Sequence, residues 1–403
     1  MKRTLLAALA AAALFAAGPV LAQKKYDRGA SDTEIKVGNF VPYSGPASAY
    51  GIVGQTLAAY VKMVNDRGGI NGRKITLLSY DDAYSPPKAV EQTRKLVEND
   101  EVLFLYQTLG TPSNASILKY MNQRKVPQLM VSSGGTRFGD HKENPWTMPF
   151  NAPYQAEGRI YAAHILKNYP NAKIGVLMPN DDYGKDIYKG IRDGLGAKAS
   201  MIVKELTYET SDPTIDSQMV ALKASGADLF LNLTTPKFAA MAIRKLGDLQ
   251  WKPVHILNNV SASTGAVIKP AGFENAQDAI TATYVKDPTD PAWKNDAAIK
   301  EWEAFVDKYM KGADKTNSLI LYSFAAAQLM EQIIKQAGDN LTRENILAQA
   351  QNLKDAKIGA LMPGIVLNTS AKDHYPIEQM QLMRFKGDKW EMFGPLLEGK
   401  VSD

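Results

Sequence analysis

The chain has no cysteine and few histidines, and these two absences exclude several kinds of site. Its 403 residues include no cysteine and four histidines. Without cysteine there can be no disulfide, no thiolate nucleophile, no thiolate-bound metal and no lipid-modified N-terminal cysteine. The histidines form neither an H-E-x-x-H motif nor a close pair, so the spacing of a metal site is also missing. We therefore expect no metal and no cofactor.

The motifs of nucleotide-binding proteins and of common hydrolases are absent as well. There is no G-x-G-x-x-G after the first predicted strand, no G-x-x-x-x-G-K-[ST] and no G-x-S-x-G. Asp81-Asp82 and Asp181-Asp182 each follow a predicted strand. Adjacent side chains on a loop usually diverge, so we interpret these pairs as solvated turns or helix caps rather than acid–base pairs. With no catalytic set visible, we predict that the chain is not an enzyme.

The chain has no large excess of positive or negative charge. The chain carries 47 lysine and arginine residues against 42 aspartate and glutamate residues. The two signs are interspersed and no long basic block occurs, which argues against nucleic-acid binding.

Long apolar runs are scarce too, and the one that occurs lies at the N-terminus. Lys2 and Arg3 precede a short apolar core at Leu5–Ala17, and Val20-Leu21-Ala22 fits the small-residue cleavage rule. We interpret residues 1–22 as a cleaved signal peptide, so that the mature chain starts near Gln23. No later stretch is long and apolar enough to span a bilayer. The expected location is the periplasm.

Apolar strand-like runs alternate with helix-like segments through the first two thirds of the chain. Strict alternation of this kind predicts an α/β fold with mostly parallel sheets and helices on both faces. Two such series, residues 31–150 and 151–280, suggest two similar doubly wound lobes. The predicted strands span residues 35–41, 75–79, 102–106, 128–131, 173–178, 201–206, 229–233 and 254–257.

The last third of the chain has a different pattern. A Pro- and Asp-rich loop at 287–293 precedes two long predicted helices, near 296–311 and 318–337. Two further strands are predicted around the turn Lys386-Gly387-Asp388, as an isolated hairpin. A chain that starts in one lobe and ends in this way is expected to cross between the lobes several times.

The loops that follow the predicted strands share one chemistry. In open parallel sheets, ligands bind beyond the carboxyl ends of the strands. Here those loops carry small hydroxyls, glycines, amides and tyrosines. Hydroxyls and free N–H groups at helix starts accept an anion such as a carboxylate, and tyrosines offer flat apolar walls. Each residue alone is equally suited to an ordinary turn or cap. The repetition across both lobes favours a binding site.

Four stretches resemble a known family. They are "IKVGNFVPYSGPASAYG", "VNDRGGINGRKITLLSYDD", "YQTLGTPSNAS" and "MPNDDYGKD". The chain resembles the periplasmic solute-binding proteins of ABC transporters for branched-chain amino acids and related compounds, over nearly all of the mature sequence. The resemblance implies a type I binding protein, with two lobes, three hinge strands and a ligand in the cleft between the lobes. We expect residues 31–150 with 283–362 to form the first lobe, and 151–282 with 363–403 the second.

The resemblance also implies roles for individual residues. Ser44 would border the cleft, and Tyr183 would line it from the second lobe. The loops at Gln107-Thr108 and Gly135-Thr136 would hold the ligand carboxylate. The candidate ligand-binding residues are Tyr43, Ser44, Gln107, Thr108, Ser133, Gly135, Thr136, Tyr154, Tyr183, Thr235, Asn259 and Ser261.

One departure from the family pattern bears on the ligand. Amino-acid binders of this kind have an acidic residue after the strand that here ends at Leu257, but this chain has Asn258-Asn259-Val260-Ser261. A buried ammonium without a carboxylate partner is costly, so the expected ligand is an aromatic acid such as a benzoate, cinnamate or aryl pyruvate. Asp181 or Asp182 could still pair with an ammonium, which keeps an amino acid or amide as the alternative.

The expected mechanism is closure of the two lobes about a hinge on the ligand. A membrane permease with a cytoplasmic ATPase would then read the closed shape of a monomeric binding protein and take up the solute unchanged. Two other classes stay open: a ligand-sensing subunit of a membrane receptor, and a secreted enzyme acting on small acids.

Overall fold

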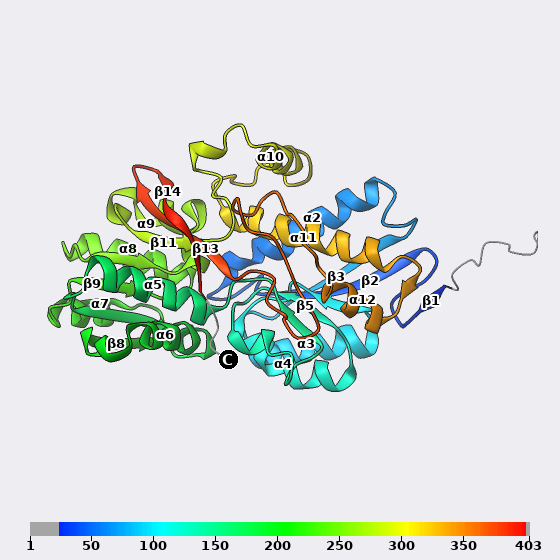
Figure 1. Cartoon of the computed structure of the whole chain (residues 1–403), viewed down its shortest axis with the longest axis horizontal. Coiled ribbons are helices and arrows are strands. Elements are labelled where there is room, and N and C mark those ends of the chain that lie inside the picture. The colour runs from blue at the N-terminus through cyan, green and yellow to red at the C-terminus, as the bar shows by residue number, and fades with distance from the viewer. Residues whose placement is uncertain (1–23, 400–403) are drawn as a thin grey trace, which may run out of the picture.

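The computed structural model describes residues 24–399 and shows an α/β molecule (Figure 1). The predicted signal peptide, residues 1–22, lies outside the described residues. The strands are β1 (Lys25–Tyr26), β2 (Glu34–Val41), β3 (Lys74–Asp81), β4 (Phe104–Tyr106), β5 (Gln128–Val131), β6 (Thr147–Pro149), β7 (Ile174–Pro179), β8 (Ile202–Tyr208), β9 (Leu229–Asn232), β10 (Val254–Leu257), β11 (Ile280–Thr283), β12 (Asn340–Leu341), β13 (Gln379–Lys386) and β14 (Lys389–Glu398).

Helices connect nearly all of these strands. Within residues 24–399, none of them combines the length and apolarity needed to cross a membrane. The helices are α2 (Gly51–Asp66), α3 (Pro86–Arg94), α4 (Thr111–Arg124), α5 (Tyr154–Asn168), α6 (Asp182–Leu195), α7 (Asp216–Ala224), α8 (Pro236–Asp248), α9 (Lys269–Ala271), α10 (Ala297–Tyr309), α11 (Ser318–Ala337) and α12 (Arg343–Ala350).

Two separate sheets organise the molecule. The first is five-stranded and parallel, in the order β3-β2-β4-β5-β6, and the second is seven-stranded, in the order β14-β13-β11-β10-β9-β7-β8. We call the unit around β2–β6, with α2–α4, α11 and α12, the first lobe, and the unit around β7–β11, β13 and β14, with α5–α8, the second lobe. In Figure 1 the second lobe lies on the left and the first on the right. The α/β fold class predicted from the sequence is confirmed.

The C-terminal hairpin is part of the second sheet, and the prediction that it stands isolated was wrong. Strand β13 pairs antiparallel with β11, with Ile280 opposite Arg384 and Thr283 opposite Gln381. The partner strand β11 has the sequence ITAT, which is short and half polar and was not recognised as a strand. The residue limits expected for the two lobes remain a prediction.

The strands at the centre of each sheet are buried on both faces. All residues of β5 and β9 are buried, as is typical of parallel strands that helices cover on both sides. Helices α2 and α11 pack against each other over the first sheet. Because both strand faces are covered, the edges at the strand ends are the places where a small molecule can reach the sheets.

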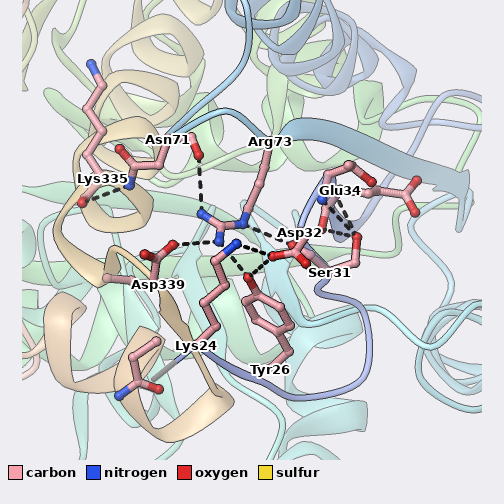
Figure 2. Close-up of polar contacts among 12 residues, drawn as sticks. Lys24, Tyr26, Ser31, Asp32, Glu34, Asn71, Arg73, Lys335 and Asp339 are labelled. Carbon is pink, nitrogen blue, oxygen red and sulfur yellow. Dashed lines mark hydrogen bonds and ion pairs between the residues drawn. The ribbon is translucent and has the colours of Figure 1, made fainter. Parts of the chain in front are cut away.

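Arg73, in the stretch "NDRGGINGRKI", anchors the start of the described chain (Figure 2). Its side chain is 3% exposed and pairs with Asp339 at 2.6 Å. The guanidinium also donates to the Ser31 carbonyl at 3.0 Å, to the Asn71 carbonyl at 3.3 Å and to the Tyr26 hydroxyl at 2.7 Å. These bonds join the segment around β1 to the turn before β3 and to the end of α11, so this motif has a structural role.

Candidate functional site

A cavity lies between the two lobes, at the carboxyl ends of the strands. It encloses about 790 Å³ of space not filled by protein, including the part open to solvent. Concave sites with mostly apolar walls and a few polar groups are typical places for a small organic molecule. Some of the cavity walls come from loops in which the sequence predicted a binding site, after β4, β5, β7 and β10, and the others come from further segments, including the start of α11 and the segment after β11.

The segment that follows each strand of the first sheet contributes at least one wall residue. In the order β2, β3, β4, β5 and β6, these include Tyr50, Tyr84, Thr111, Ser132 and Asn151. All five strands are parallel, so their carboxyl ends meet at one edge of the sheet. Thr111 also begins α4, and the first N–H groups of a helix have no partner within the helix.

The second lobe supplies the opposite wall. Tyr183 follows β7, Asn259 and Val260 follow β10, and residues 283–287 end β11 and continue beyond it. Helix α11 adds Tyr322 from the first lobe. The cavity is therefore built from segments that lie far apart in the sequence.

Six tyrosines line the cavity and give it flat apolar walls with polar tips. Burial raises the pKa of every one of their hydroxyls, and raises that of Tyr154 to about 12. The rings of Tyr154 and Tyr183 meet edge to face with their centroids 4.8 Å apart. The phenols stay neutral at physiological pH, so they offer hydrogen bonds without charge. The six are Tyr50, Tyr84, Tyr154, Tyr183, Tyr284 and Tyr322.

Hydrogen bonds fix the polar side chains of the first-lobe wall. The Tyr322 hydroxyl donates to Asn151 Oδ1 at 2.7 Å and lies 3.0 Å from Ser132 Oγ. The Thr111 and Ser133 hydroxyls are 2.7 Å apart. These links hold the wall in place before any ligand arrives, which reduces the entropy lost on binding.

Tyr84 is held toward the cavity by Asp82, which lies at the end of β3. Asp82 is fully buried and accepts hydrogen bonds from Ser113 Oγ at 2.5 Å and from the Tyr84 N–H at 3.1 Å. Tyr84 has a left-handed backbone, with φ of +58°. Burial raises the pKa of Asp82 to about 6. The sequence predicted a solvated turn or a helix cap here; Asp82 does bond a turn N–H, but it is buried rather than solvated.

Asp181 has the capping role that the sequence suggested. Its Oδ1 accepts from the Gly184 N–H at 3.0 Å and caps the start of α6. Burial raises the pKa of Asp181 to about 6. Among residues 24–399 its second oxygen, Oδ2, is buried without a hydrogen-bond partner. Asp181 therefore retains the capacity to accept one more hydrogen bond.

Two charged residues, Lys286 and Asp287, lie in the cavity wall after β11. The Lys286 ammonium pairs with Asp296 at 2.7 Å. Asp287 accepts from the Thr289 N–H at 2.8 Å and is 4% exposed. Burial raises the pKa of Asp287 to about 6. The lysine charge is thus neutralised by Asp296, whereas within residues 24–399 the Asp287 carboxylate accepts hydrogen bonds from the neutral Thr289 alone.

The turn that carries Asn259 is held by the buried carboxyl of Glu157 in α5. Glu157 Oε1 accepts from the Asn259 N–H at 2.7 Å and from the Tyr161 hydroxyl at 2.8 Å. The Asn259 amide donates to the Ala282 carbonyl at 2.6 Å. Burial raises the pKa of Glu157 to about 7. The second-lobe wall thus depends on a carboxyl group that does not itself line the cavity.

Three of the twelve sequence-predicted site residues, Tyr154, Tyr183 and Asn259, line the cavity. The other nine lie outside this lining, and their contact with a ligand stays a prediction. Seven of them bond to neighbouring groups: Tyr43 to Ser79, Ser44 to Asp81, Gln107 to Ser323, Thr108 to Asn114, Ser133 to Thr111, Thr235 to Tyr208, and Ser261 to the Thr234 carbonyl. The remaining two are Gly135, which packs against Phe138, and Thr136, which bonds to Asp186.

Sequence reasoning missed several wall residues. Thr111 and Ser132 each lie within or beside a loop that the sequence singled out, and only the turn geometry decides which residue of the loop faces the cavity. Tyr84 follows the Asp81-Asp82 pair, which the sequence pattern assigns to a solvated turn or a helix cap. Tyr322 is inside a long helix, where no signal in the sequence marks it.

Comparison with known proteins supports the same assignment. The sequence pattern of the family described as "Periplasmic binding protein" matches residues 34–389. This chain belongs to that family. It is 27% identical over 350 residues to the Leu/Ile/Val-binding protein homolog 1 of Brucella abortus (strain 2308), covering 85% of this chain and 87% of that protein. The resemblance predicted from the sequence is confirmed.

Solved structures show the same fold for this periplasmic binding protein. A branched chain amino acid ABC transporter protein from Thermus thermophilus with bound valine matches with a TM-score of 0.81 at 14% identity, covering 92% of this chain and 97% of that one. A fatty acid ABC transporter substrate-binding protein from Thermomonospora curvata matches with a TM-score of 0.77 at 21% identity, covering 93% and 95%. The family consists of solute-binding proteins that work outside the cytoplasm.

Proposed function

We propose that this periplasmic binding protein captures a small carboxylate with an aromatic or apolar body and delivers it to the permease of an ABC importer. The observation that carries the proposal is the tyrosine-lined cavity between the lobes. Six neutral tyrosines suit a flat apolar body. Gly110 and Thr111, at the first turn of α4, line the same cavity, and a helix start is a favourable place for a carboxylate.

The mechanism follows from the position of the cavity. A ligand that touches only one lobe gains part of its contacts, and closure of the lobes adds the rest. The closed form is favoured by the free energy of those additional contacts. A permease that recognises only the closed form then receives loaded protein, and the energy for uptake comes from its ATPase. The binding protein itself makes and breaks no covalent bond.

A second candidate ligand, an amino acid, is favoured by two buried carboxyl groups. Among the residues that the structure describes, Asp287 lines the cavity with no cationic partner, and Asp181, two residues before the wall residue Tyr183, retains a buried oxygen with no hydrogen-bond partner. Either group could receive an ammonium, which would replace the acidic residue that is missing after β10. An ammonium next to Asp287 or Asp181 would keep that carboxyl ionised, because a nearby positive charge lowers its pKa.

A matched pair of ligands separates the two candidates. Phenylpyruvate and phenylalanine share a ring and a carboxylate, and differ in a keto group against an ammonium. Thermal unfolding of the mature protein should be measured with each, and with benzoate, cinnamate, leucine and valine, since a ligand that binds only the native state raises the melting temperature. Stabilisation by phenylpyruvate but not phenylalanine supports the aromatic-acid proposal.

The opposite outcome is also informative. Stabilisation by phenylalanine, leucine or valine alone would replace the aromatic acid with an amino acid. Mass spectrometry of the small molecules that co-purify with the protein gives an independent answer. If none of these compounds co-purifies or stabilises the protein, the proposed ligand classes are both wrong.

A further inference from the structure

A carboxylate side chain of the second lobe accepts hydrogen bonds from a turn of the first lobe. Asp186, in α6, accepts from the Thr136 N–H at 2.8 Å and from the Thr136 hydroxyl at 2.9 Å through its Oδ2. Thr136 begins the short helix Thr136–Gly139, which lies between β5 and β6 of the first sheet. The contact therefore joins the two lobes. Neither residue lines the cavity.

Both partners of this contact are fixed by their own surroundings. The other oxygen of Asp186 accepts from the Gln155 side-chain amide at 2.8 Å, within the second lobe. The Thr136 carbonyl accepts from the Tyr375 hydroxyl at 2.6 Å, and the Tyr375 ring packs against Gly139. Because both groups are held in position, little side-chain entropy is lost when they meet.

A weaker ion pair lies beside this bond, between the next residue of the turn and the start of the same helix. The Arg137 guanidinium is 3.3 Å from the Asp182 carboxylate, and the two side chains are 50% and 38% exposed. An exposed pair of this kind contributes little. The half-buried Thr136–Asp186 contact, with two hydrogen bonds to one charged oxygen, is the stronger of the two.

We propose that Asp186 is a positioning residue that holds the lobes closed over the cavity without touching the ligand. Hydrogen bonds to a charged group favour the closed form by a factor of roughly ten or more. The apparent affinity is reduced in proportion to the fraction of the protein that is open and not competent to bind. Asp186 increases the closed fraction, so it raises the apparent affinity for every ligand alike. This inference needs the two lobes and the cavity between them, and does not depend on which ligand binds.

The absence of cysteine makes the proposal directly measurable. Lys119 in α4 of the first lobe and Lys204 in β8 of the second are both exposed. Replacing them by Lys119→Cys and Lys204→Cys gives two unique sites for spin labels. The distance between the labels is then measured by pulsed electron paramagnetic resonance on the ligand-free mature protein. No ligand has to be known, so a failure of the proposed function leaves this test valid.

Asp186→Ala should shift the distances toward longer, open values, and Asp186→Asn should do so to a smaller extent. Thr136→Val removes the hydroxyl donor from the other side and should shift them in the same direction. Combining Asp186→Ala with Thr136→Val should add little beyond Asp186→Ala, because both changes break one interaction. The matched control is Asp193→Ala, on the same helix, whose carboxylate pairs with Lys189 and Arg159 of its own lobe.

The control should leave the distance distribution unchanged, and circular dichroism should show that all variants stay folded. Two results would overturn the proposal: an Asp186→Ala distribution that superimposes on that of the parent, or an equal shift in the Asp193→Ala control. If phenylpyruvate or phenylalanine binds, Asp186→Ala should weaken its affinity roughly tenfold and leave the preference between the two unchanged.

Discussion

The ring of Tyr84 lies 2.9 Å from the point where a Cβ atom on Gly110 would stand. Both residues line the cavity, one after β3 and the other after β4. Gly110 also has a positive φ of +104°, a conformation that other residues rarely adopt. The close approach of these two loops is therefore possible only because the β4 loop has a glycine at this position.

Gly110→Ala should displace the Tyr84 ring and weaken ligand binding. We expect a loss of about 1–3 kcal/mol in the free energy of unfolding, from overpacking and backbone strain together. Urea unfolding and thermal shift with phenylpyruvate and phenylalanine measure the two effects. Gly226→Ala is the matched control, because Gly226 has a positive φ of +75° with no atom near the added Cβ. An equal loss of ligand response in both variants would contradict the role of the Tyr84 contact.

Tyr183→Ala should remove one wall of the cavity. Its ring meets that of Tyr154 edge to face, so truncation also loosens a second wall residue. We expect ligand affinity to fall by about 1–3 kcal/mol, as is common when a buried aromatic contact is truncated. Calorimetry with the best ligand of the thermal-shift series measures the change. Tyr188→Ala changes a residue of the same helix that bonds to Glu205 outside the cavity, and it should leave the affinity unchanged.

Glu157→Gln should alter the pH dependence of stability. Burial raises the pKa of Glu157 from 4.5 to about 7, so the folded protein holds this proton more tightly than the unfolded chain. The resulting stabilisation is complete below pH 4.5 and is lost as the pH rises to about 7. Between pH 5 and pH 8 the parent should lose roughly 2–3 kcal/mol from this group, and the variant should not.

Urea unfolding of parent and variant at both pH values tests this prediction. Asp82, Asp181 and Asp287 also have raised pKa values and titrate in the same direction in both proteins. Their contribution cancels when the two pH dependences are subtracted. Identical pH dependence in parent and variant would show that Glu157 does not titrate in this range.

Arg73→Ala should destabilise the protein strongly although it lies far from the cavity. The buried guanidinium makes four hydrogen bonds that join three segments (Figure 2). We expect a loss of about 2–4 kcal/mol in urea unfolding, with ligand specificity unchanged. Arg28→Ala is the control, since Arg28 pairs with Glu101 with its side chain 72% exposed. That exposed pair should contribute less than about 1 kcal/mol, so similar losses in both variants would contradict this account.

The sequence pattern predicted a helix or strand well where that element buries a single, clear stripe or run of apolar residues. The strands predicted at residues 128–131 and 254–257 and the helix at 318–337 coincide with β5, β10 and α11. Helix α5 was missed because its buried residues face the sheet, α6 and the C-terminal hairpin together, and leave no single apolar stripe. Strands β6 and β11 were missed because they are short, Thr147–Pro149 and Ile280–Thr283, and because threonine interrupts the apolar run that marks a buried strand.

The sequence by itself determined the α/β class, the family and the edge of the sheets at which the cavity lies, because these depend on local periodicity and on loops that directly follow strands. Only the tertiary structure decided which side chains meet in the cavity. Thr111 faces it while Thr108 bonds to Asn114, and Tyr322 reaches Asn151 from a helix more than a hundred residues further along the chain. Such choices depend on turn geometry and on the packing of one lobe against the other, and neither is a property of a local stretch of sequence.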